Sequence, residues 1–254
     1  MLIRLMSGIK KMALYKLYRT RLHCDPIFAA RFRRWKKYLP NGCRVLEIGP
    51  GGGAWSIELL NRDNAVTVID KFSDSLDRLR FKVDSYPISN KRIEIICSDA
   101  QSYKSDMKFD QIIIFEVLEH IKNDKAVILN LANLLRKGGK LLISTPSDDY
   151  KPFYGEEGLD HKEEGGHVRK GYSFKDFEGL FNGTGLKLVF KDSCAGFFTQ
   201  KISAFGRILR CRFNMINIFV VGVIFFLRWV CWFDFLCPAY PKYVNFIIAE
   251  KIDE

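Results

Sequence analysis

The most constraining stretch of this chain is a glycine-rich turn that follows a short apolar run. Residues 44–53 read Arg-Val-Leu-Glu-Ile-Gly-Pro-Gly-Gly-Gly, and the residues from Ala54 to Leu60 can form a helix directly after them. Glycine lets the backbone turn tightly and approach a ligand, because a Cβ atom would clash there. The first N–H groups of the following helix have no partner within the helix. Such a turn is typical of a site for a nucleotide-like cofactor.

Three more apolar runs are each expected to form a strand that ends beside a polar or acidic residue. Val66–Ile69 is followed by Asp70, Ile93–Cys97 by Ser98, Asp99 and Ala100, and Phe109–Phe115 by Glu116. Asp70 lies about 20 positions after the glycines, where an acidic residue can bind ribose hydroxyls. Ligands of open α/β sheets bind where the strands end. The pattern therefore predicts an α/β fold with a cofactor at one edge of the sheet.

These motifs, in this order, resemble those of the class I S-adenosylmethionine-dependent methyltransferases. They are Glu47-Ile48-Gly49-Pro50-Gly51-Gly52-Gly53, Asp70, Asp99-Ala100, Phe109-Asp110, Glu116-Val117-Leu118-Glu119-His120 and Leu135-Arg136-Lys137-Gly138-Gly139. The resemblance covers residues 25–190 and Val244–Lys251. It implies a Rossmann-like, seven-stranded sheet with helices on both faces, and S-adenosylmethionine as the cofactor.

The same resemblance implies which residues contact the cofactor. They are Glu47, Gly49, Gly51, Gly53, Asp70, Asp99, Ala100 and Glu116. The first two would lie beside the methionine part, and the next two would form the turn. Asp70 would bind the ribose, and the following pair would flank the adenine. NAD is the weaker prediction, because Ala54 stands where G-x-G-x-x-G requires its third glycine.

Length and composition are compatible with one domain that carries an insertion. The chain has 254 residues, 48% of them hydrophobic. Its seven cysteines form no C-x-x-C pair and several lie in apolar runs, so we expect reduced, buried thiols and a cytoplasmic protein without a secretory signal. We divide the chain into a basic segment (1–40), a cofactor-binding core (41–193), a hydrophobic helical insertion (194–243) and a last core strand (244–254).

Positive charge is concentrated at the N-terminus. Residues 1–40 hold eleven Lys and Arg and one acidic residue, Asp25, which accounts for ten of the eleven net positive charges. Apolar residues interleave with these charges, and this pattern predicts one or two basic amphipathic helices. Such a segment suits an anionic membrane surface or a nucleic-acid backbone. A helix that only packs on the sheet is the alternative.

A second unusual segment lies between the expected sixth strand, Lys187–Lys191, and the seventh, Val244–Glu250. It is rich in Phe, Trp, Ile and Val, and its uncharged part, Met215–Leu227, is 13 residues long. Spanning a bilayer takes roughly 18 or more apolar residues. We therefore expect an interfacial or lid element, since Trp and Tyr beside Arg settle at the headgroup level. A buried helical insertion or a dimer interface is the alternative, and the oligomeric state stays open.

The residues after the fourth strand bring two carboxylates and an imidazole close together. If the chain is helical from Val117 onward, Glu116, Glu119 and His120 share one face and can attract a divalent cation. Glu-x-x-Glu-His with a later histidine resembles the metal-dependent O-methyltransferases of ubiquinone biosynthesis and of small RNA. This resemblance implies that these three residues and His167 bind a metal such as Mg2+.

A hydroxyl acceptor needs a base or a metal because its pKa is high. Without a metal, the general base would be His167 or His161; both can also be loop histidines without a role. The loop 146–172 follows the fifth strand, which we expect at Lys140–Thr145. By the resemblance this loop covers the acceptor. Its candidate acceptor contacts are Asp148, Tyr150, Tyr154 and Arg169, and a helix is expected after Ser173 as N-cap.

Three functions remain open on the sequence. The leading one is S-adenosylmethionine-dependent O-methylation of a membrane-associated or lipid-linked small molecule, such as a quinol precursor or a lipid-linked sugar, by a protein peripheral on the inner face of the membrane. The second is an RNA methyltransferase that uses the basic N-terminus. The aromatic insertion argues against an RNA methyltransferase, because this segment lacks the interleaved Lys and Arg of a base-stacking groove. The third is a methyltransferase-fold protein that binds without catalysis.

Overall fold

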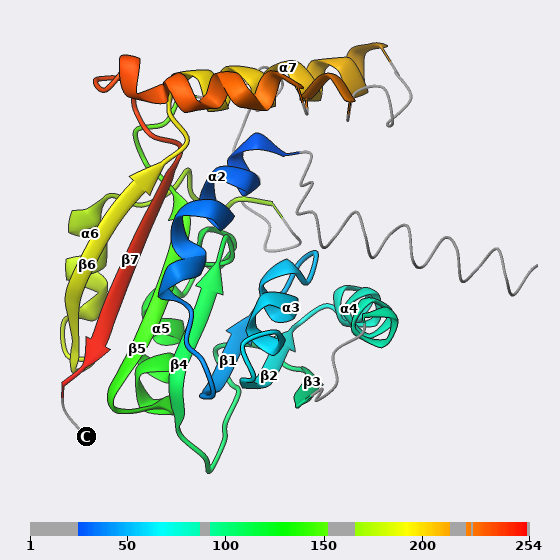
Figure 1. The fold of residues 1–254 in the computed structure, drawn as a ribbon. Helices are drawn as coiled ribbons and strands as arrows, with labels where there is room; N and C mark the ends of the chain where they lie inside the picture. Colours follow the sequence, from blue (N-terminus) through cyan, green and yellow to red (C-terminus); the bar gives the residue numbers. More distant parts are fainter. Residues whose placement is uncertain (1–24, 87–91, 152–165, 214–221, 225, 253–254) are drawn as a thin grey trace, which may run out of the picture.

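A seven-stranded sheet forms the centre of the molecule in the computed structural model, which describes residues 25–86, 92–151, 166–213, 222–224 and 226–252 (Figure 1). The strand order is β3-β2-β1-β4-β5-β7-β6, with β7 antiparallel to both of its neighbours. The strands are β1 (Arg44–Ile48), β2 (Ala65–Asp70), β3 (Ile93–Cys97), β4 (Phe109–Phe115), β5 (Leu135–Pro146), β6 (Leu186–Cys194) and β7 (Val244–Lys251). The α/β class and the seven-stranded sheet are thus confirmed.

Helices cover both faces of this sheet (Figure 1). On one face lie α2 (Pro26–Trp35), the 3₁₀ helix η1 (Lys36–Tyr38), α3 (Ala54–Leu60) and α4 (Ser73–Ser85). On the other lie α5 (Asp124–Leu134) and α6 (Phe174–Phe181), while the 3₁₀ helix η2 (Leu118–His120) follows β4. A third layer, α7 (Phe197–Phe213) with the 3₁₀ helix η3 (Arg228–Leu236), runs across the edge where β1, β4 and β5 end.

Most expected elements are confirmed, but two strands are longer than the apolar pattern indicates. β6 continues to Cys194 and β5 begins at Leu135. The reason for β6 is its partner, because β7 pairs with it as far as Cys194 opposite Val244. The helix expected after Ser173 is α6, and Ser173 and Asp176 form a reciprocal capping box at its start.

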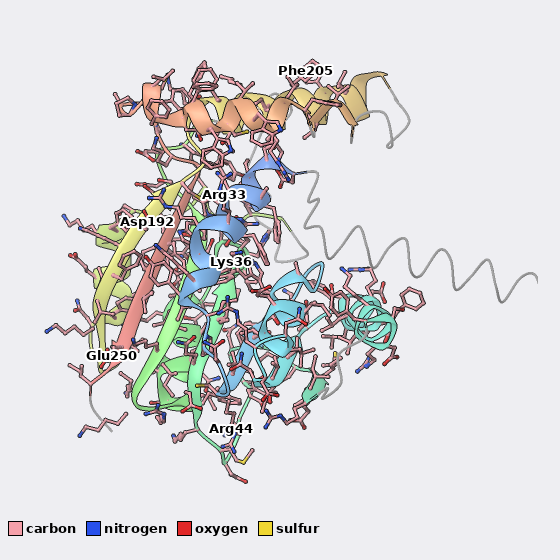
Figure 2. The ribbon with its side chains drawn as sticks, in the orientation of Figure 1. Arg33, Lys36, Arg44, Asp192, Phe205 and Glu250 are labelled. Atoms are coloured by element: carbon pink, nitrogen blue, oxygen red, sulfur yellow. The ribbon has the colours of Figure 1, made fainter. Side chains whose placement is uncertain are left out.

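The basic N-terminal segment is described only from Asp25 onward, where the carboxylate of Asp25 caps α2. One face of α2 packs on the sheet, and the Trp35 ring stacks on Phe246 at 4.6 Å. Arg33 of the same helix is exposed (Figure 2), and Arg34 forms an ion pair with Asp192 of β6. This part of the segment therefore packs on the core, and most of its cations, apart from the largely buried Arg31, lie at the surface. Residues 1–24 lie outside the described residues.

The hydrophobic insertion before the last strand is helical, as expected, over the parts that are described. Asp234 of η3 accepts hydrogen bonds from the N–H groups of Gly196 and Thr199 and from the Thr199 hydroxyl. Cys231 is buried between the two helices, whereas Cys97 on β3 is exposed. Within the described ranges, none of the helices combines the length and the apolarity that crossing a bilayer requires. Residues 214–221, in the uncharged run, lie outside these ranges.

Candidate active site

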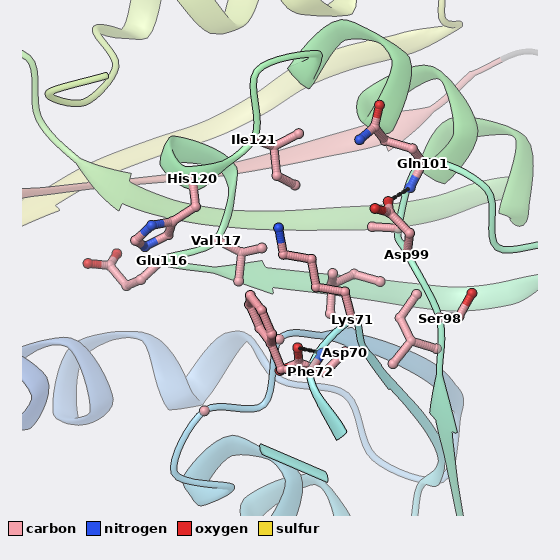
Figure 3. Close-up of a pocket in the computed structure, with 15 residues that line it drawn as sticks. Asp70, Lys71, Phe72, Ser98, Asp99, Gln101, Glu116, Val117, His120 and Ile121 are labelled. Atoms are coloured by element: carbon pink, nitrogen blue, oxygen red, sulfur yellow. Dashed lines mark hydrogen bonds between the residues drawn. The ribbon is translucent and has the colours of Figure 1, made fainter. Parts of the chain in front are cut away.

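A cleft of about 230 Å³ opens where β1, β2, β3 and β4 end (Figure 3). It includes six of the eight predicted cofactor residues, namely Gly49, Gly51, Asp70, Asp99, Ala100 and Glu116. Three further lining residues, Ile48, Val117 and His120, belong to the motifs, and the motifs do not contain the others, namely Ile69, Lys71, Phe72, Ser98, Gln101 and Ile121. The only sequence signal for the residues outside the motifs is their place near a strand end. Lys71 reaches into the cleft from an exposed position, so it can move aside for a ligand.

The glycine turn needs glycine for two reasons. Gly49, Gly51 and Gly53 all have φ between 49° and 69°, a left-handed conformation that other residues adopt at a cost. A Cβ on Gly49 would collide with the side chain of Val117, and one on Gly53 would come within 2.7 Å of Leu79 Cδ1. Gly53 does not line the cleft; its N–H donates to the Pro50 carbonyl at 2.7 Å and closes the turn.

Two aspartates at adjacent strand ends are held by backbone N–H groups. Asp70 accepts a hydrogen bond from Phe72 N at 2.9 Å, and Asp99 from Gln101 N at 2.7 Å (Figure 3). Each bond engages one oxygen of its carboxylate and so orients the side chain in the cleft. Partial burial raises the pKa of Asp70, although nearby hydrogen bonds and lysine charge oppose this. A diol that donates to Asp70 suits this environment.

Glu47, the acidic residue of β1, is buried under α3 and does not line the cleft. Burial raises the pKa of Glu47 to about 7, and nearby Ser56 opposes the rise. Its Oε2 atom has no hydrogen-bond partner among the described residues. A buried, unpaired carboxylate oxygen is unfavourable, so this position suits a ligand that brings a donor or a positive charge.

Glu116 lies at the end of β4 in a strained backbone conformation, with φ 55°. Ser144 of β5 makes two hydrogen bonds with Glu116. The Ser144 carbonyl accepts from the Glu116 N–H at 2.8 Å, and the Ser144 hydroxyl donates to Glu116 Oε1 at 2.7 Å. The same oxygen lies 2.9 Å from Nη1 of Arg31, on α2. Arg31 is largely buried, and the charge of Glu116 raises its pKa against the effect of burial. The motifs do not indicate Arg31, because its partner is distant in the sequence.

Glu119, His120 and His167 come together beside the cleft, with one potential ligand atom from each within 4.8 Å of the others. His120 Nδ1 lies 2.9 Å from the Gly166 carbonyl, which can only accept, so Nδ1 carries the proton. Its Nε2 lies 3.9 Å from Glu119 Oε1, and the two imidazole rings meet edge to face at 4.7 Å. Glu119 is buried, and burial, followed by the charge of Glu116, raises its pKa well above the ordinary value.

The expected helical arrangement of these ligands is wrong. Only the short η2 follows β4, because Glu116 turns into the left-handed region and the His120 N–H bonds back to the Val117 carbonyl. Glu116 lies outside the group of three and is bound to Arg31 and Ser144 instead.

The candidate acceptor contacts are dispersed. Arg169 is engaged by Asp124 and by the carbonyls of Ile121 and Lys122. Tyr150 is buried against Tyr243, and Asp148 is exposed. His161 and Tyr154 lie outside the described residues.

The profile of a methyltransferase-domain family matches residues 17–190. The chain therefore belongs to this family of S-adenosylmethionine-dependent methyltransferases. It is similar to the ubiquinone biosynthesis O-methyltransferase of Coxiella burnetii, with 32% identity over 116 residues that cover 44% of this chain and 47% of the relative. The mitochondrial enzyme of the same name from Schizosaccharomyces pombe is 27% identical over 42% of this chain and 39% of its own. The chain spans about half the length of the curated relatives it matches.

Solved structures show the same fold at low sequence identity. Coclaurine N-methyltransferase, bound to N-methylheliamine and S-adenosylhomocysteine, matches 94% of this chain and 72% of its own with a TM-score of 0.58 and 16% identity. The [4+2]-cyclase SpnF matches 84% of this chain and 77% of its own with a TM-score of 0.58 and 15% identity. Because a cyclase shares it, this fold alone does not fix the reaction.

Proposed function

We propose that this protein transfers the methyl group of S-adenosylmethionine to a hydroxyl of a membrane-associated small molecule, such as a quinol precursor or a lipid-linked sugar. The observation that carries the proposal is the group of Glu119, His120 and His167 next to the cofactor cleft. An amine acceptor can attack once it is neutral, but a hydroxyl needs help to lose its proton. This group would supply that help, and its member His120 lines the cleft.

In this proposal, residues that line the cleft and two buried residues outside its lining bind the three parts of the cofactor. Asp70 would accept from the ribose hydroxyls, and Asp99 and Ala100 would border the adenine. The methionine part carries an ammonium and a carboxylate. Glu47, with its unpaired buried oxygen, would be drawn to the ammonium, and Arg31 beside Glu116 would bind the carboxylate.

The group of three fits a divalent cation. Glu119 Oε2 is buried without a hydrogen-bond partner in the described part of the chain, and the Gly166 carbonyl fixes the tautomer that leaves His120 Nε2 available. One carboxylate and two imidazoles suit Mn2+, Fe2+ or Zn2+ better than Mg2+, which prefers oxygen ligands. Such a cation would lower the pKa of an acceptor hydroxyl. Glu116, bound elsewhere, is not included.

The transfer is an in-line displacement. The acceptor oxygen forms a bond to the methyl carbon while the carbon–sulfur bond breaks, and the electron pair of that bond stays on sulfur as a neutral thioether. The hydroxyl proton leaves the acceptor for solvent or for an unprotonated imidazole of the group. The protein contributes by holding the two reactants in line and by excluding water. Of these two effects, alignment contributes more to the rate.

The test is methyl transfer from labelled S-adenosylmethionine to a prenylated catechol in detergent, before and after chelation and after return of Mn2+, Zn2+ or Mg2+. We expect chelation to abolish transfer and Mn2+ or Zn2+ to restore it. Glu119→Gln should lower the rate at least tenfold with little change in S-adenosylhomocysteine affinity. Glu178→Gln, at an exposed position on α6, is the matched control.

Each other outcome removes a named part of the proposal. Full activity after chelation would overturn the metal and leave an imidazole, His167 as first predicted or its neighbour His120, as the base. Labelling of an amine or carbon acceptor alone would overturn O-methylation. Absence of S-adenosylhomocysteine binding would overturn the enzyme and favour a binding protein.

A further inference from the structure

An aromatic stripe runs along the helix before the last strand. Phe226, Trp229, Trp232 and Phe235 are spaced by three residues, and their exposed fractions are 76%, 66%, 60% and 68%. A 3₁₀ helix has 3.0 residues per turn, so side chains three apart lie directly above one another. Because η3 is such a helix, its spacing collects Trp229, Trp232 and Phe235 on one side, and Phe226 lies one further step of three before them, just ahead of η3. Four exposed aromatic side chains in a row form a large apolar surface for one helix.

The other side of η3 is fixed to the protein. Cys231 is buried against α7, and Asp234 holds the first turn of α7 through Gly196 and Thr199. Cys231 and Asp234 are also three residues apart, so they share one side of η3. Because they are offset by one position from Trp232 and Phe235, this side differs from the side of the stripe. The stripe is therefore the face that η3 turns away from its own packing. On α7, Phe205 is also exposed, on the side away from the sheet (Figure 2).

The segment that carries this surface is basic, and cations lie beside several of its aromatic rings. Residues 195–243 contain six Lys and Arg and one acidic residue, Asp234, which is already bound by α7. The guanidinium of Arg33 lies 4.9 Å from the Trp232 ring, and Lys201 lies over the Phe197 and Tyr240 rings. Aromatic rings beside cations are the composition that settles at the headgroup level of an anionic leaflet. A second copy of the chain would bring like charges together instead.

We propose that the surface formed by Phe226, Trp229, Trp232 and Phe235 docks on an anionic phospholipid bilayer. The rings enter the interface while Arg33 and Lys201 meet the lipid phosphates. The α7–η3 layer runs across the sheet edge where the cofactor cleft opens, so docking turns this edge toward the membrane. The docking goes beyond the proposed methyl transfer, and it is measured without any reaction.

Tryptophan fluorescence reports this docking directly. The chain has four tryptophans; Trp35 and Trp55 are buried, so Trp229 and Trp232 carry the solvent-sensitive emission. We expect phosphatidylserine-containing vesicles to shift the emission of the full-length protein to the blue. Phosphatidylcholine vesicles and RNA should leave it unchanged. High salt should weaken vesicle binding, because the lipid contacts are partly ionic.

A matched pair of variants tests the stripe itself. Phe235→Glu places a charge in the stripe and keeps both reporting tryptophans. Phe81→Glu makes the same change at a similarly exposed ring on α4, whose exposed fraction is 64%. Vesicle co-sedimentation should show about tenfold weaker binding for Phe235→Glu. Phe81→Glu should bind as the unmodified protein does, and circular dichroism should show that both variants are folded.

Several results would overturn the proposal. They are an unchanged emission with anionic vesicles, equal weakening by both substitutions, and a blue shift caused by RNA. A dimer with blue-shifted emission before any lipid is added would assign the stripe to a second copy. Since vesicle binding needs neither cofactor nor acceptor, its failure leaves the methyl-transfer test unaffected.

Discussion

Glu47 is one of two buried carboxylates near this site, with Glu119, whose charge state is changed by folding. The folded protein holds its proton up to about pH 7, whereas an unfolded chain releases it near 4.5. Between these values the native state binds more protons, so the free energy of unfolding falls as pH rises. The difference corresponds to about 3 kcal/mol, an upper value that relaxation of the site would reduce.

Glu47→Gln should remove this part of the pH dependence. The variant should unfold at a similar denaturant concentration at pH 4, and should be more stable than the unmodified protein by up to about 3 kcal/mol at pH 8. Denaturant unfolding at a series of pH values, without cofactor, measures the difference. Glu178→Gln is the control. A difference that is constant from pH 4 to pH 8 would show that Glu47 is ionised in the folded protein.

The position of Arg31 predicts that this residue contributes to cofactor affinity. Its guanidinium is largely buried beside Glu116, which lines the cleft. Arg31→Met should weaken S-adenosylhomocysteine binding at least tenfold, because the ligand carboxylate would lose a charged donor. Arg33→Met on the same helix, at an exposed position, should leave the affinity unchanged. Calorimetric titration of both variants with S-adenosylhomocysteine measures the two affinities. Equal affinities of the two variants would rule out this role of Arg31.

The loop before α6 depends on one polar clamp. Arg169 binds Asp124 at the start of α5 and two carbonyls after η2, and the Tyr172 hydroxyl donates to Asp124 at 2.8 Å. Val168 N also donates to the Glu119 carbonyl at 3.0 Å. We infer that the clamp holds His167 beside His120; Arg169 is engaged within the protein, and its contact with an acceptor remains a prediction.

Removing this clamp should loosen the loop before it unfolds the protein. Arg169→Met should lower the free energy of unfolding by about 1 kcal/mol, since the ion pair is partly exposed. Hydrogen exchange should accelerate over residues 166–172 and stay unchanged in the central strands. Lys170→Met, whose side chain lies over the Tyr150 ring, is the neighbouring control. Exchange that accelerates equally with both substitutions would contradict the clamp.

At the scale of the whole molecule, cofactor binding should stabilise the fold. A ligand present at 100 times its Kd adds about 2.7 kcal/mol to the free energy of unfolding. For a chain of this size that corresponds to a Tm increase of roughly 5–10 °C. Differential scanning fluorimetry with S-adenosylhomocysteine measures it, and NADH at the same concentration is the control. Stabilisation by NADH instead would show that the cleft takes a dinucleotide.

Much of the lining of the cleft was predictable because its determinants are local, while the binding of the cofactor by these residues remains a prediction. Gly49 and Gly51 line the cleft as expected, and their left-handed φ angles explain why glycine stands there. Asp70 and Asp99 were recognisable because each directly follows an apolar run that forms a strand. The division of the chain into four segments, the membrane contact and the inner-face location remain predictions.

The sequence by itself determined the strands, the glycine turn and the family, because side-chain alternation and backbone preference act within a few residues. Only the tertiary structure decided that Arg31 reaches Glu116, that His167 meets His120, and that Arg169 is engaged in a clamp. These pairings join segments far apart in the chain, and sheet geometry brings them together. The aromatic stripe was also not predictable from the sequence. Residues spaced by three lie directly above one another only in a 3₁₀ helix, and the structure shows that η3 is one.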